Sequence, residues 1–469
     1  MIAELSAHKG EEILIKGWVD VARNQGKMAF FDFRDVSGTI QGVVFGKPEV
    51  LETAKELRPE WVVAITGKVN ERPEKMVKEG VVNGDIELEI TGIKVLNKAE
   101  TPVFELDKDT REVNNETRLK NRYLDLRTKR MQNNIRMRHA LVKHVRDYLD
   151  NKGFFEIETP LLTKSTPEGA RDYLVPSRLY PGSFYALPQS PQQYKQLLMS
   201  SGFEKYFQFA KCMRDEDQRG DRQPEFTQMD MEMSFVTEED IMQLNEQMLI
   251  DLVQKLYPEK KIQEIPFPRI PYAEAMEKYG NDRPDIRNDK EDPNLLAFCW
   301  VVDFPFFEKT ADSDDPQAVG EWTFTHNPFS QAKPDHVEKL RNKQDIGDIM
   351  ASQYDIVLNG FEIGGGSIRA HDPETLRATL QILGHEDEKI DQNFGHMLKA
   401  LGSGTPPHGG IAWGLDRLVM LLQNEESIAE VIAFPKTREA RDPMLEAPSK
   451  ATVDQLMDLK IRIDKKDEE

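Results

Sequence analysis

The chain has 469 residues, a formal net charge of −20 and two cysteines, and 39% of its residues are apolar. The length predicts about two or three domains, while the acidic balance excludes indiscriminate nucleic-acid binding, which needs a generally basic surface. The cysteines support neither a disulfide framework nor a cysteine zinc site, and neither a secretory signal nor a membrane span is evident, so we expect a cytoplasmic protein without membrane contact.

Residues 12–96 are predicted to form a small β-barrel. Short β-rich runs such as EILIKGWVDVA, KMAFFDFRD and WVVAITGKVN are separated by Gly, Asn or Pro, with one helical turn near VLETAKELR. Five such strands favour a Greek-key barrel of the OB type, a fold that often binds unpaired bases. Phe30, Phe31 and Phe33 lie on one strand, so only one of the two parities can face outward.

Residues 105–135 are predicted to be a linker or hinge that follows a barrel domain at 1–104. The sequence NKAETPVFELDKDTREVNNET, at its start, has no helical or strand periodicity. Residues 118–144 are strongly basic, with Asp125 as their only acid. Two interpretations of this basic segment remain open: a solvated helix face, or a hinge that faces a polyanion.

Residues 136–469 are predicted to form an α+β domain with an antiparallel sheet flanked by helices. A helix is expected from Met137 to a stop at Gly153, followed by a strand, FFEIETPLL, that ends at Pro160. Neither G-x-G-x-x-G nor G-x-x-x-x-G-K-[ST] occurs, and regular βαβ alternation is missing. Rossmann-type and P-loop nucleotide binding are therefore disfavoured.

Two neighbouring segments suggest a site for a small zwitterion. Glu168 in TPEGARDYLVPSR belongs to a loop that is a candidate lid, where it could meet an ammonium group. Gln192 and Lys195 in QSPQQYK are three residues apart and share a helix face. An amide beside a cation suits a carboxylate that needs further hydrogen bonds, although an ordinary surface helix is the alternative interpretation.

The segment CMRDEDQRGDRQPEFTQMDMEM joins a charged loop to a strand of alternating polarity. Arg214 ends a strand-like run, and Glu216 lies two residues further on. A planar guanidinium can bind a phosphate and a carboxylate at once. We interpret the loop and strand as the floor of a site for a ligand with both charges; an exposed hairpin with a polar outer face is the alternative.

Two later segments supply candidates for phosphate and cation binding. In DIVLNGFEIGGGSIR, Asp355 and Glu362 lie near an apolar strand, and three glycines permit close approach of a ligand, although they also suit a plain turn. Carboxylates beside a phosphate site suit Mg²⁺. In GGIAWGLDRLVML, Arg417 falls in the first helical turn, where the helix dipole does not favour a cation, and such a conflict is typical of functional sites.

In this order the segments resemble the three signature motifs of class II aminoacyl-tRNA synthetases. FFEIETPLL is similar to the first motif, FQFAKCMRDEDQRGDRQPEFTQMDMEMSF to the second and GGIAWGLDRLVML to the third. TPEGARDYLVPSR, QSPQQYKQLLM, RQPEFTQMD and LNGFEIGGGSIR resemble the bacterial type of aspartyl-tRNA synthetase. WVDVARNQGKMAFFDFRDVSGTIQ carries the resemblance into the barrel, so it spans essentially the whole chain.

The resemblance implies a reaction in two steps that uses ATP and Mg²⁺. The α-carboxylate of L-aspartate attacks the α-phosphate of ATP, and the aspartyl group then passes to the terminal adenosine of tRNA(Asp), with tRNA(Asn) left open as a second acceptor. The implied catalytic residues are Arg214, Glu362 and Arg417. The implied aspartate-binding residues are Glu168, Gln192, Lys195, Arg214, Asp230, His326 and Arg369. The implied ATP-binding residues are Arg214, Asp215, Glu216, Gln223, Glu362, Gly414, Leu415, Asp416 and Arg417. The implied metal ligands are Asp355, Glu362 and Ser367.

The resemblance also implies an anticodon-binding barrel and a homodimer. Arg23, Phe30 and Gln41 match the anticodon readers, and Pro160 is expected at the dimer interface. Asn327 stands where relatives commonly have a second histidine. The domain that bacterial relatives usually insert between motifs 2 and 3 is replaced here by a short polar stretch, NDKEDPN.

Three other functions remain as alternatives. An asparaginyl- or lysyl-type synthetase would share the class II motifs but differ in the amino acid that it activates. A non-catalytic tRNA-binding relative would be expected to lose Arg214, Glu362 or Arg417, and all three are present. An amide-forming enzyme that uses aspartate and ATP would have little reason to carry an anticodon-type barrel.

Overall fold

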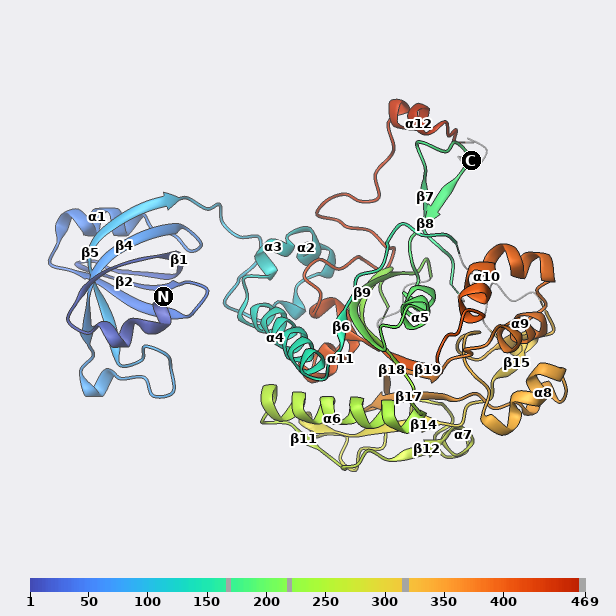
Figure 1. The fold of residues 1–469 in the computed structure, drawn as a ribbon. Helices are drawn as coiled ribbons and strands as arrows, with labels where there is room; N and C mark the ends of the chain where they lie inside the picture. The colour runs from blue at the N-terminus through green and yellow to red at the C-terminus, as the bar shows by residue number, and fades with distance from the viewer. Residues whose placement is uncertain (166–169, 217–221, 314–319, 464–469) are drawn as a thin grey trace. The chain divides into compact units, whose positions relative to one another are not determined.

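The computed structural model describes residues 1–165, 170–216, 222–313 and 320–463. The chain divides into two compact units, Met1–Lys129 and Arg130–Glu469 (Figure 1). The point of division falls inside the segment 105–135 that the sequence predicted as a linker. Across the ranges that the structure describes, every helix is too short or too polar to cross a membrane.

The first unit contains a closed barrel of five strands in the order β1-β2-β3-β5-β4, which confirms the predicted OB-type fold. Pairs β1–β2, β1–β4, β2–β3 and β4–β5 are antiparallel, and β3 pairs with β5 in parallel to close the barrel. Its elements are η1 (Ile2–His8), β1 (Glu12–Gln25), β2 (Met28–Arg34), β3 (Thr39–Phe45), α1 (Pro48–Glu56), β4 (Val62–Glu71), η2 (Glu74–Met76) and β5 (Ile86–Asn97).

Strand β2 settles which phenylalanines face outward. Phe31 and Phe33 are buried in the barrel core with their ring centroids 5.7 Å apart, whereas Phe30 is half-buried on the opposite side of the strand. Because residues of a strand alternate between its two faces, Phe30 lies on the outer surface of the barrel. It pairs across the sheet with Arg23 of β1.

The end of the first unit is more ordered than the sequence predicted. It contains η3 (Thr110–Glu112), α2 (Asn115–Lys120) and α3 (Arg122–Asp125). The buried carboxylate of Asp125 accepts hydrogen bonds from Arg118 Nη2 at 3.0 Å, Arg122 Nη1 at 2.5 Å and Thr110 Oγ1 at 2.5 Å. The interpretation as a hinge that faces a polyanion is therefore wrong for Arg118 and Arg122, because both are buried and neutralised within the unit.

The second unit is built on an eight-stranded sheet in the order β12-β14-β17-β18-β19-β10-β9-β6. Each edge strand is parallel to its neighbour, β12 to β14 and β6 to β9. The other described neighbours in this sheet are antiparallel, in agreement with the predicted sheet. The strands are β6 (Phe155–Glu156), β9 (Lys205–Met213), β10 (Glu225–Ser234), β12 (Arg269–Pro271), β14 (Phe298–Val302), β17 (Gln353–Leu358), β18 (Phe361–Ile368) and β19 (His408–Gly414).

One face of this sheet is covered by three helices, α4 (Lys129–Asn151), α6 (Glu238–Leu256) and α11 (Leu415–Leu422) (Figure 1). Met229, Met231 and Met233 of β10 enter a common core with residues of these helices. The opposite face carries the intervening polar residues of β10 and is bordered by α5 (Gln192–Ser200), which contacts β9 and β10.

Helix α4 begins at Lys129, eight residues before the predicted start at Met137. The sequence prediction followed apolar periodicity, but the first turns of α4 present Arg130, Asn134 and Arg138 to polar partners instead. Gly153 has a φ of 80°, as expected of a residue that ends a helix. Strand β6 is shorter than predicted, since it pairs with β9 through two residues before Pro160.

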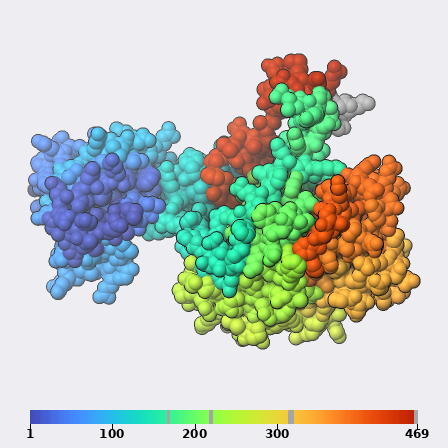
Figure 2. All heavy atoms as spheres, viewed as in Figure 1, coloured from blue at the N-terminus to red at the C-terminus, as the bar shows by residue number. Residues whose placement is uncertain are grey.

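The remaining elements surround the sheet. They are β7 (Leu174–Pro176), β8 (Phe184–Ala186), β11 (Lys261–Ile262), α7 (Tyr272–Tyr279), β13 (Leu295–Leu296), β15 (Phe307–Lys309), η4 (Thr310–Asp312), β16 (Trp322–Phe324), η5 (Pro334–His336), α8 (Val337–Asn342), η6 (Ile346–Asp348), α9 (Pro373–Ile382), α10 (Asp387–Leu401), η7 (Ile428–Glu430) and α12 (Val453–Leu459). The β7–β8 hairpin stands out from the surface of the second unit (Figure 2).

A closed polar turn occupies the place where the inserted domain was expected. Helix α7 ends at Gly280, which has a φ of 73°. Beyond it, Arg287 forms an ion pair with Asp285 at 2.8 Å, and Gln263 Nε2 donates to the Ile286 carbonyl at 3.0 Å. The Asn288 N–H donates to Gln263 Oε1 at 2.9 Å. These contacts hold the start of the NDKEDPN stretch, which leads directly to β13.

Candidate active site

A cavity of about 470 Å³ opens over the polar face of the large sheet. Strands β10, β17, β18 and β19, the start of α11 and the segment around His326 supply its walls. Predicted residues that line it are Arg214, Glu216, Gln223, His326, Asp355, Glu362, Gly414, Asp416 and Arg417. Its volume falls in the range of small-molecule and cofactor sites.

The polar residues of β10 form a line that begins at this cavity. Gln228 lies in the cavity wall, and Asp230 and Glu232 follow on the same face of the strand. The alternation in EFTQMDMEM is therefore that of a buried strand with an apolar core face and a charged site face. The alternative interpretation as an exposed hairpin is wrong, because Asp230 and Glu232 are both buried.

Two buried cations, Lys195 and Arg369, meet these carboxylates. Lys195 Nζ of α5 lies 2.6 Å from Asp230 Oδ1 and 3.3 Å from Glu232 Oε2. Arg369 Nε donates to Glu232 Oε1 at 2.9 Å, and its Nη1 donates to Ser367 Oγ at 2.7 Å. Lys195 and Arg369 are each only 2% exposed, which excludes the surface-helix interpretation of Lys195.

Glu232 is the member of this group that sequence reasoning did not assign. It is fully buried and contacts both Lys195 and Arg369. It lies opposite Gly410 of β19, and a Cβ on Gly410 would stand 2.2 Å from Glu232 Oε2. The signal was present in the alternation of EFTQMDMEM, which places Glu232 two residues from Asp230 on the same face.

The electrostatics of the two carboxylates differ. Burial raises the pKa of Asp230 above its ordinary value, although Lys195 acts in the opposite sense. Burial also acts to raise the pKa of Glu232, but the charges of Arg369 and Lys195 outweigh it and hold that pKa below its ordinary value. Asp230 Oδ2 is buried without a hydrogen-bond partner among the described residues, so this oxygen can accept a bond from a ligand cation.

Gln192 is buried on the same helix as Lys195. Its Nε2 donates to Gln196 Oε1 at 3.0 Å, and Gln196 Nε2 lies 3.1 Å from His408 Nε2. Burial lowers the pKa of His408, which is consistent with a neutral ring that accepts from the Gln196 amide. The glutamine pair thus links α5 to the start of β19.

Asp355 and Glu362 occupy one spot on the wall of the cavity. A Cβ on Gly365 would stand 2.7 Å from Asp355 Oδ1 and 3.7 Å from Glu362 Oε1, so a glycine at this position makes room for both. Burial, and then the charges of Glu362 and Asp282, raise the pKa of Asp355 well above its ordinary value. The buried carboxylate of Asp355 and the half-buried carboxylate of Glu362 repel each other and together fit a divalent cation, which would relieve the repulsion.

Two predicted residues have partners other than those that the resemblance implied. His326 Nε2 lies 3.5 Å from Asp355 Oδ2, and its Nδ1 contacts Gln353 Nε2, so in this structure the ring contacts the carboxylate wall. Burial lowers the pKa of His326. Ser367 Oγ contacts Ser330 Oγ at 2.9 Å and Arg369, and no group of three or more His, Cys, Asp or Glu side chains in the described ranges forms a metal site.

The motif 2 residues gather at the other end of the cavity. Arg214 lies over the Phe226 ring, 5.2 Å from its centroid, and its Nε is buried without a partner among the described residues. Gln223 exchanges two hydrogen bonds with the backbone of Lys436, at 3.1 and 2.7 Å. Arg222 pairs with Glu216 at 3.1 Å. Asp215 forms an isolated β-bridge with Arg171.

Arg417 extends from the first turn of α11 into the cavity, where its Nη1 contacts the Glu362 carbonyl oxygen. Gly414 precedes the helix, and a Cβ there would stand 3.8 Å from the Arg417 Cβ. Leu415 is buried in the core beneath the helix. Glu168 lies outside the described residues.

The three predicted anticodon readers share the outer face of the barrel. Arg23 is exposed opposite Phe30, and Gln41 of β3 lies opposite Asp32 of β2. Gln41 Oε1 accepts a hydrogen bond from Arg72 Nη2 at 2.9 Å. An arginine only donates, so this contact fixes the orientation of the Gln41 amide and leaves its NH₂ group directed elsewhere.

Comparison with known proteins gives the family. The description "tRNA synthetases class II (D, K and N)" matches residues 114–438, and "OB-fold nucleic acid binding domain" matches residues 13–96. An aspartate–tRNA(Asp/Asn) ligase of Rubrobacter xylanophilus is 38% identical over 98% of this chain and 95% of its own length. An aspartate–tRNA ligase of Staphylococcus aureus is 39% identical over 97% of each protein.

The same alignments document the shorter length of this chain. The first extends over 583 positions, whereas the chain has 469 residues, so at least 114 positions of that alignment have no counterpart here. This difference agrees with the loss of an inserted domain that the sequence predicted.

Solved structures share the fold. The asparaginyl-tRNA synthetase of Pyrococcus horikoshii with asparaginyl-adenylate has a TM-score of 0.72 at 22% identity, and covers 92% of this chain and 96% of its own. The aspartyl-tRNA synthetase of Entamoeba histolytica has a TM-score of 0.70 at 24% identity, and covers 93% and 90%. With the near full-length relatives above, these findings show that the chain belongs to the aspartate–tRNA ligase family of class II tRNA synthetases.

Proposed function

We propose that the protein activates L-aspartate with ATP and transfers the aspartyl group to the 3′ end of tRNA(Asp). The observation that carries this proposal is the pair of buried cations, Lys195 and Arg369, on the polar face of the sheet. A ligand with one ammonium and two carboxylates matches a site with two cations and a carboxylate oxygen that still lacks a donor. The names of the curated relatives support the same substrate.

The substrate can enter by an exchange of ion pairs. In this structure Asp230 Oδ1 is paired with Lys195, while Asp230 Oδ2 has no hydrogen-bond partner among the described residues. The ammonium group of aspartate can take Asp230, and the side-chain carboxylate of aspartate can then take Lys195 and Arg369. Glu232 stays between the two cations and keeps them in place when Asp230 changes partner.

Adenylate formation needs positioned charges rather than a protein nucleophile. The α-carboxylate oxygen of aspartate forms a bond to the α-phosphorus of ATP, and the bond from that phosphorus to the bridging oxygen breaks to release pyrophosphate. Arg214 would bind both the carboxylate and the α-phosphate, and Arg417 would bind the outer phosphates. Both arginines line the same cavity, which holds these groups in one arrangement.

The carboxylates of Asp355 and Glu362 would hold Mg²⁺, with Ser367 as the third residue that the resemblance implies. When bound, the cation would neutralise phosphate charge. Gly365 keeps the space between the two carboxylates open. Burial, and then the charges of Glu362 and Asp282, raise the pKa of Asp355, and a bound cation would offset the part that comes from repulsion.

Selection against asparagine follows from the same charges. A neutral amide at the side-chain position would leave buried cations without a full counter-charge once Asp230 has bound the ammonium group. Breaking a buried pair in this way costs about 3–5 kcal/mol, or roughly 10²- to 10⁴-fold in binding. A lysyl-type substrate would place a third cation beside Lys195 and Arg369 and is excluded more strongly.

The test is ATP–pyrophosphate exchange with each amino acid in turn. We expect exchange with aspartate and at least 100-fold less with asparagine or lysine. Lys195→Met should abolish exchange with aspartate, because the isosteric chain removes one cation and keeps the volume. Near-normal exchange by Lys195→Met, or a preference for asparagine, would overturn the substrate assignment.

The acceptor is the second part of the proposal. The relatives from Rubrobacter xylanophilus and Natranaerobius thermophilus are named aspartate–tRNA(Asp/Asn) ligase. The Staphylococcus aureus relative is named aspartate–tRNA ligase, without a stated acceptor. Arg23, Phe30 and Gln41 on the outer face of the barrel would read the anticodon by stacking and hydrogen bonds. Charging of purified tRNA(Asp) and tRNA(Asn) separates an enzyme that uses one acceptor from an enzyme that uses both.

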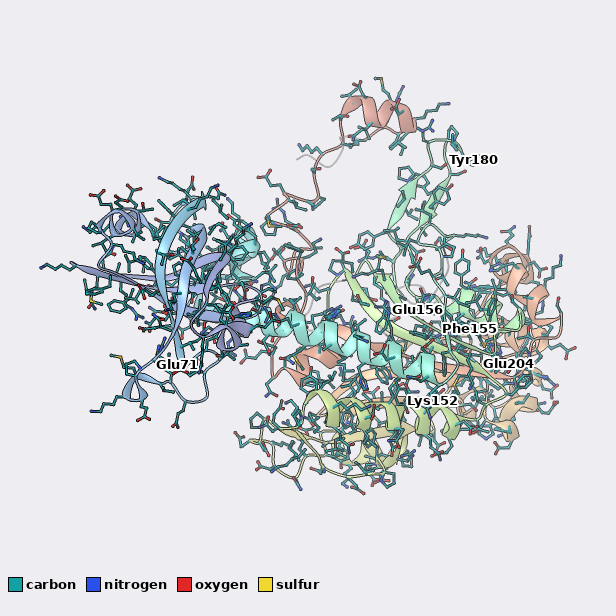
Figure 3. The ribbon with its side chains drawn as sticks, turned by 60° about the vertical axis from the view of Figure 1, so that its left-hand side comes forward. Glu71, Lys152, Phe155, Glu156, Tyr180 and Glu204 are labelled. Carbon is teal, nitrogen blue, oxygen red and sulfur yellow. The ribbon has the colours of Figure 1, made fainter. Side chains whose placement is uncertain are left out.

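We also propose that the enzyme is a cytoplasmic homodimer built on the edge of the large sheet. Phe155 of β6 is 59% exposed at the edge of the large sheet (Figure 3). Its ring lies edge-on to that of Phe203, in the loop before β9, with 6.1 Å between the ring centroids. Leu161 and Leu162, just after Pro160, are also about half-exposed. Sedimentation of wild type and Phe155→Glu tests this, and we expect a dimer that the substitution weakens.

A further inference from the structure

We infer that Arg138 of helix α4 is a positioning residue for the ATP-binding arginine, Arg417, and that it acts through Asp416. This inference rests on the proposed function, because it assigns a role within the ATP half of the same site. Arg138 itself does not line the cavity, whereas Asp416 and Arg417 both do.

Asp416 joins three separate elements through one buried carboxylate. Arg138 Nη1 donates to Asp416 Oδ1 at 2.5 Å and to the Val431 carbonyl at 3.3 Å. Asp416 Oδ2 accepts from the backbone N–H of Thr227 on β10 at 2.9 Å. The side chain of Asp416 is 5% exposed, so these contacts are shielded from water and from salt.

The contact with β10 lies where the sheet ends and the helix begins. Strands β10 and β19 pair from Ser234 opposite His408 to Gln228 opposite Gly414. After Gly414 the chain turns into α11, so β19 has no backbone carbonyl to offer the next N–H of β10. Asp416 supplies the acceptor instead and fixes the first turn of α11 to the strand.

Leu415 packs that first turn against the core. The residue before it, Gly414, makes no side-chain cap, so the turn lacks the local hydrogen bond that usually anchors a helix start. Arg417 follows Asp416 directly and reaches the Glu362 carbonyl oxygen across the cavity. A small rotation of this turn would therefore move the Arg417 guanidinium away from the phosphates.

Helix α4 holds the other end of the same region by a matched contact. Arg130, eight residues before Arg138 and on the same side of the helix, donates to Glu425 and to Glu430 at 2.8 Å each. Asn134, midway between them, donates to Glu425 at 2.7 Å. Arg130 thus ties α4 to the segment after α11, away from the turn that carries Arg417, and serves as an internal control.

The simpler reading is that Arg138 only stabilises the fold. A buried ion pair that loses one partner costs stability wherever it lies. Under that reading, Arg138→Met and Arg130→Met should both lower thermal stability and should change catalysis alike. Under our inference they should differ, because only the Arg138 contact sets the position of an arginine that touches ATP.

The experiment measures ATP–pyrophosphate exchange by wild type, Arg138→Met, Arg138→Lys and Arg130→Met, with ATP and aspartate varied separately. For Arg138→Met we expect kcat/KM for ATP to fall roughly 10- to 100-fold, with KM for aspartate within about twofold of wild type. Arg138→Lys keeps the charge and should recover part of the loss. Arg130→Met should keep kcat/KM for ATP within about threefold of wild type even where its melting temperature falls.

Direct ATP binding by calorimetry, without aspartate, gives the second readout. Weaker ATP binding by Arg138→Met and Asp416→Asn, with no further loss in the double variant, is the result expected if Arg138 acts through Asp416. Unchanged KM and affinity for ATP in Arg138→Met, or an equal loss in Arg130→Met, overturns the inference. If wild type shows no exchange with aspartate, the proposed function fails, and the calorimetric comparison still decides the role of Arg138.

Discussion

Glu232 lies between the two cations that face the candidate amino-acid site. Its carboxylate contacts Arg369 Nε at 2.9 Å and Lys195 Nζ at 3.3 Å. For Glu232→Gln, which keeps the shape and removes the charge, we expect kcat/KM for aspartate to fall by roughly 100-fold, corresponding to about 3 kcal/mol for a broken buried pair. Pyrophosphate exchange with aspartate varied at saturating ATP measures this loss.

Glu71 offers the matched control for that substitution. It pairs with Lys9 at 3.1 Å on the barrel surface, with 71% of its side chain exposed. Exposed pairs contribute little, so Glu71→Gln should leave exchange unchanged. A Glu232→Gln enzyme within threefold of wild type would show that the two cations hold their positions without this carboxylate.

Gly410 makes space for Glu232 and cannot easily accept a side chain. A Cβ there would stand 2.0 Å from the Met231 carbonyl oxygen and 2.2 Å from Glu232 Oε2. We expect Gly410→Ala to lower the free energy of unfolding by about 1–3 kcal/mol and to raise KM for aspartate, because it displaces the carboxylate. Denaturant unfolding and pyrophosphate exchange measure the two effects.

Gly395, inside helix α10, is the opposite case. Nothing lies within 4 Å of a Cβ built on it, and its backbone is helical. Gly395→Ala should therefore stabilise the protein by about 0.5–1 kcal/mol without a change in KM. Equal behaviour of Gly395→Ala and Gly410→Ala would contradict the packing that we describe around Glu232.

Asp230 predicts a pH dependence of aspartate binding. Burial raises its pKa, so protonation begins at a higher pH than for an ordinary aspartate. The ionised form is the one that can bind the substrate ammonium. KM for aspartate should therefore rise as the pH falls from neutrality into the weakly acidic range, and Asp230→Asn should have a high KM that no longer changes there. A wild-type KM with the same pH dependence as that of Asp230→Asn would contradict this role.

For Arg417 the sequence itself carried a signal, a cation in the first turn of a helix, whereas the roles of Lys195 and Arg369 were implied by the resemblance. Lys195, Arg214, Arg369 and Arg417 are cations in segments that the structure buries or points into the cavity. The sequence analysis assigned no role to Glu232, because it is one acid among several in a charged stretch. Its contacts with Gly410 and Arg369 join residues that are far apart in the sequence.

At the scale of elements, apolar periodicity predicted a helix correctly where its inward side chains are apolar. It failed where the inward side chains are polar and bind buried partners. Leu141, Val145 and Leu149 of α4 are fully buried, as their spacing predicted. The first turns of α4 were missed because their inward side chains are Arg130 and Asn134, which bind Glu425 and Glu430. A periodicity rule counts such residues as solvent-facing.

The short helices before α4 were missed for the same physical reason. Their core is the carboxylate of Asp125 with Arg118 and Arg122 around it, not an apolar stripe. The triple glycine shows the converse. Each of its members meets a different close neighbour: Trp413 and Ala412 at Gly364, Asp355 at Gly365, and the Gly410 carbonyl at Gly366. A sequence pattern can mark such a site but cannot name those neighbours.

For the whole molecule, the division into a barrel and a larger α+β unit followed from the sequence, because each unit has its own periodicity and its own core. The separate cores predict separable activities. Under the proposed function, activation of the amino acid would depend on the second unit, and recognition of the tRNA anticodon on the first. Substitutions on the outer face of the barrel should therefore affect the second reaction step alone.

Substitution of Gln41 tests whether tRNA recognition can be lost without loss of amino-acid activation. Arg72 donates to Gln41 Oε1, so the amide NH₂ is the group offered to a base. Gln41→Glu keeps the size and the contact with Arg72 but replaces the donor by an acceptor, while Phe30→Ala removes the half-buried ring on the same face. Both variants should lose roughly 10-fold or more in tRNA charging and keep wild-type pyrophosphate exchange. Parallel loss of both activities would show that the barrel serves the stability of the enzyme rather than the recognition of its tRNA.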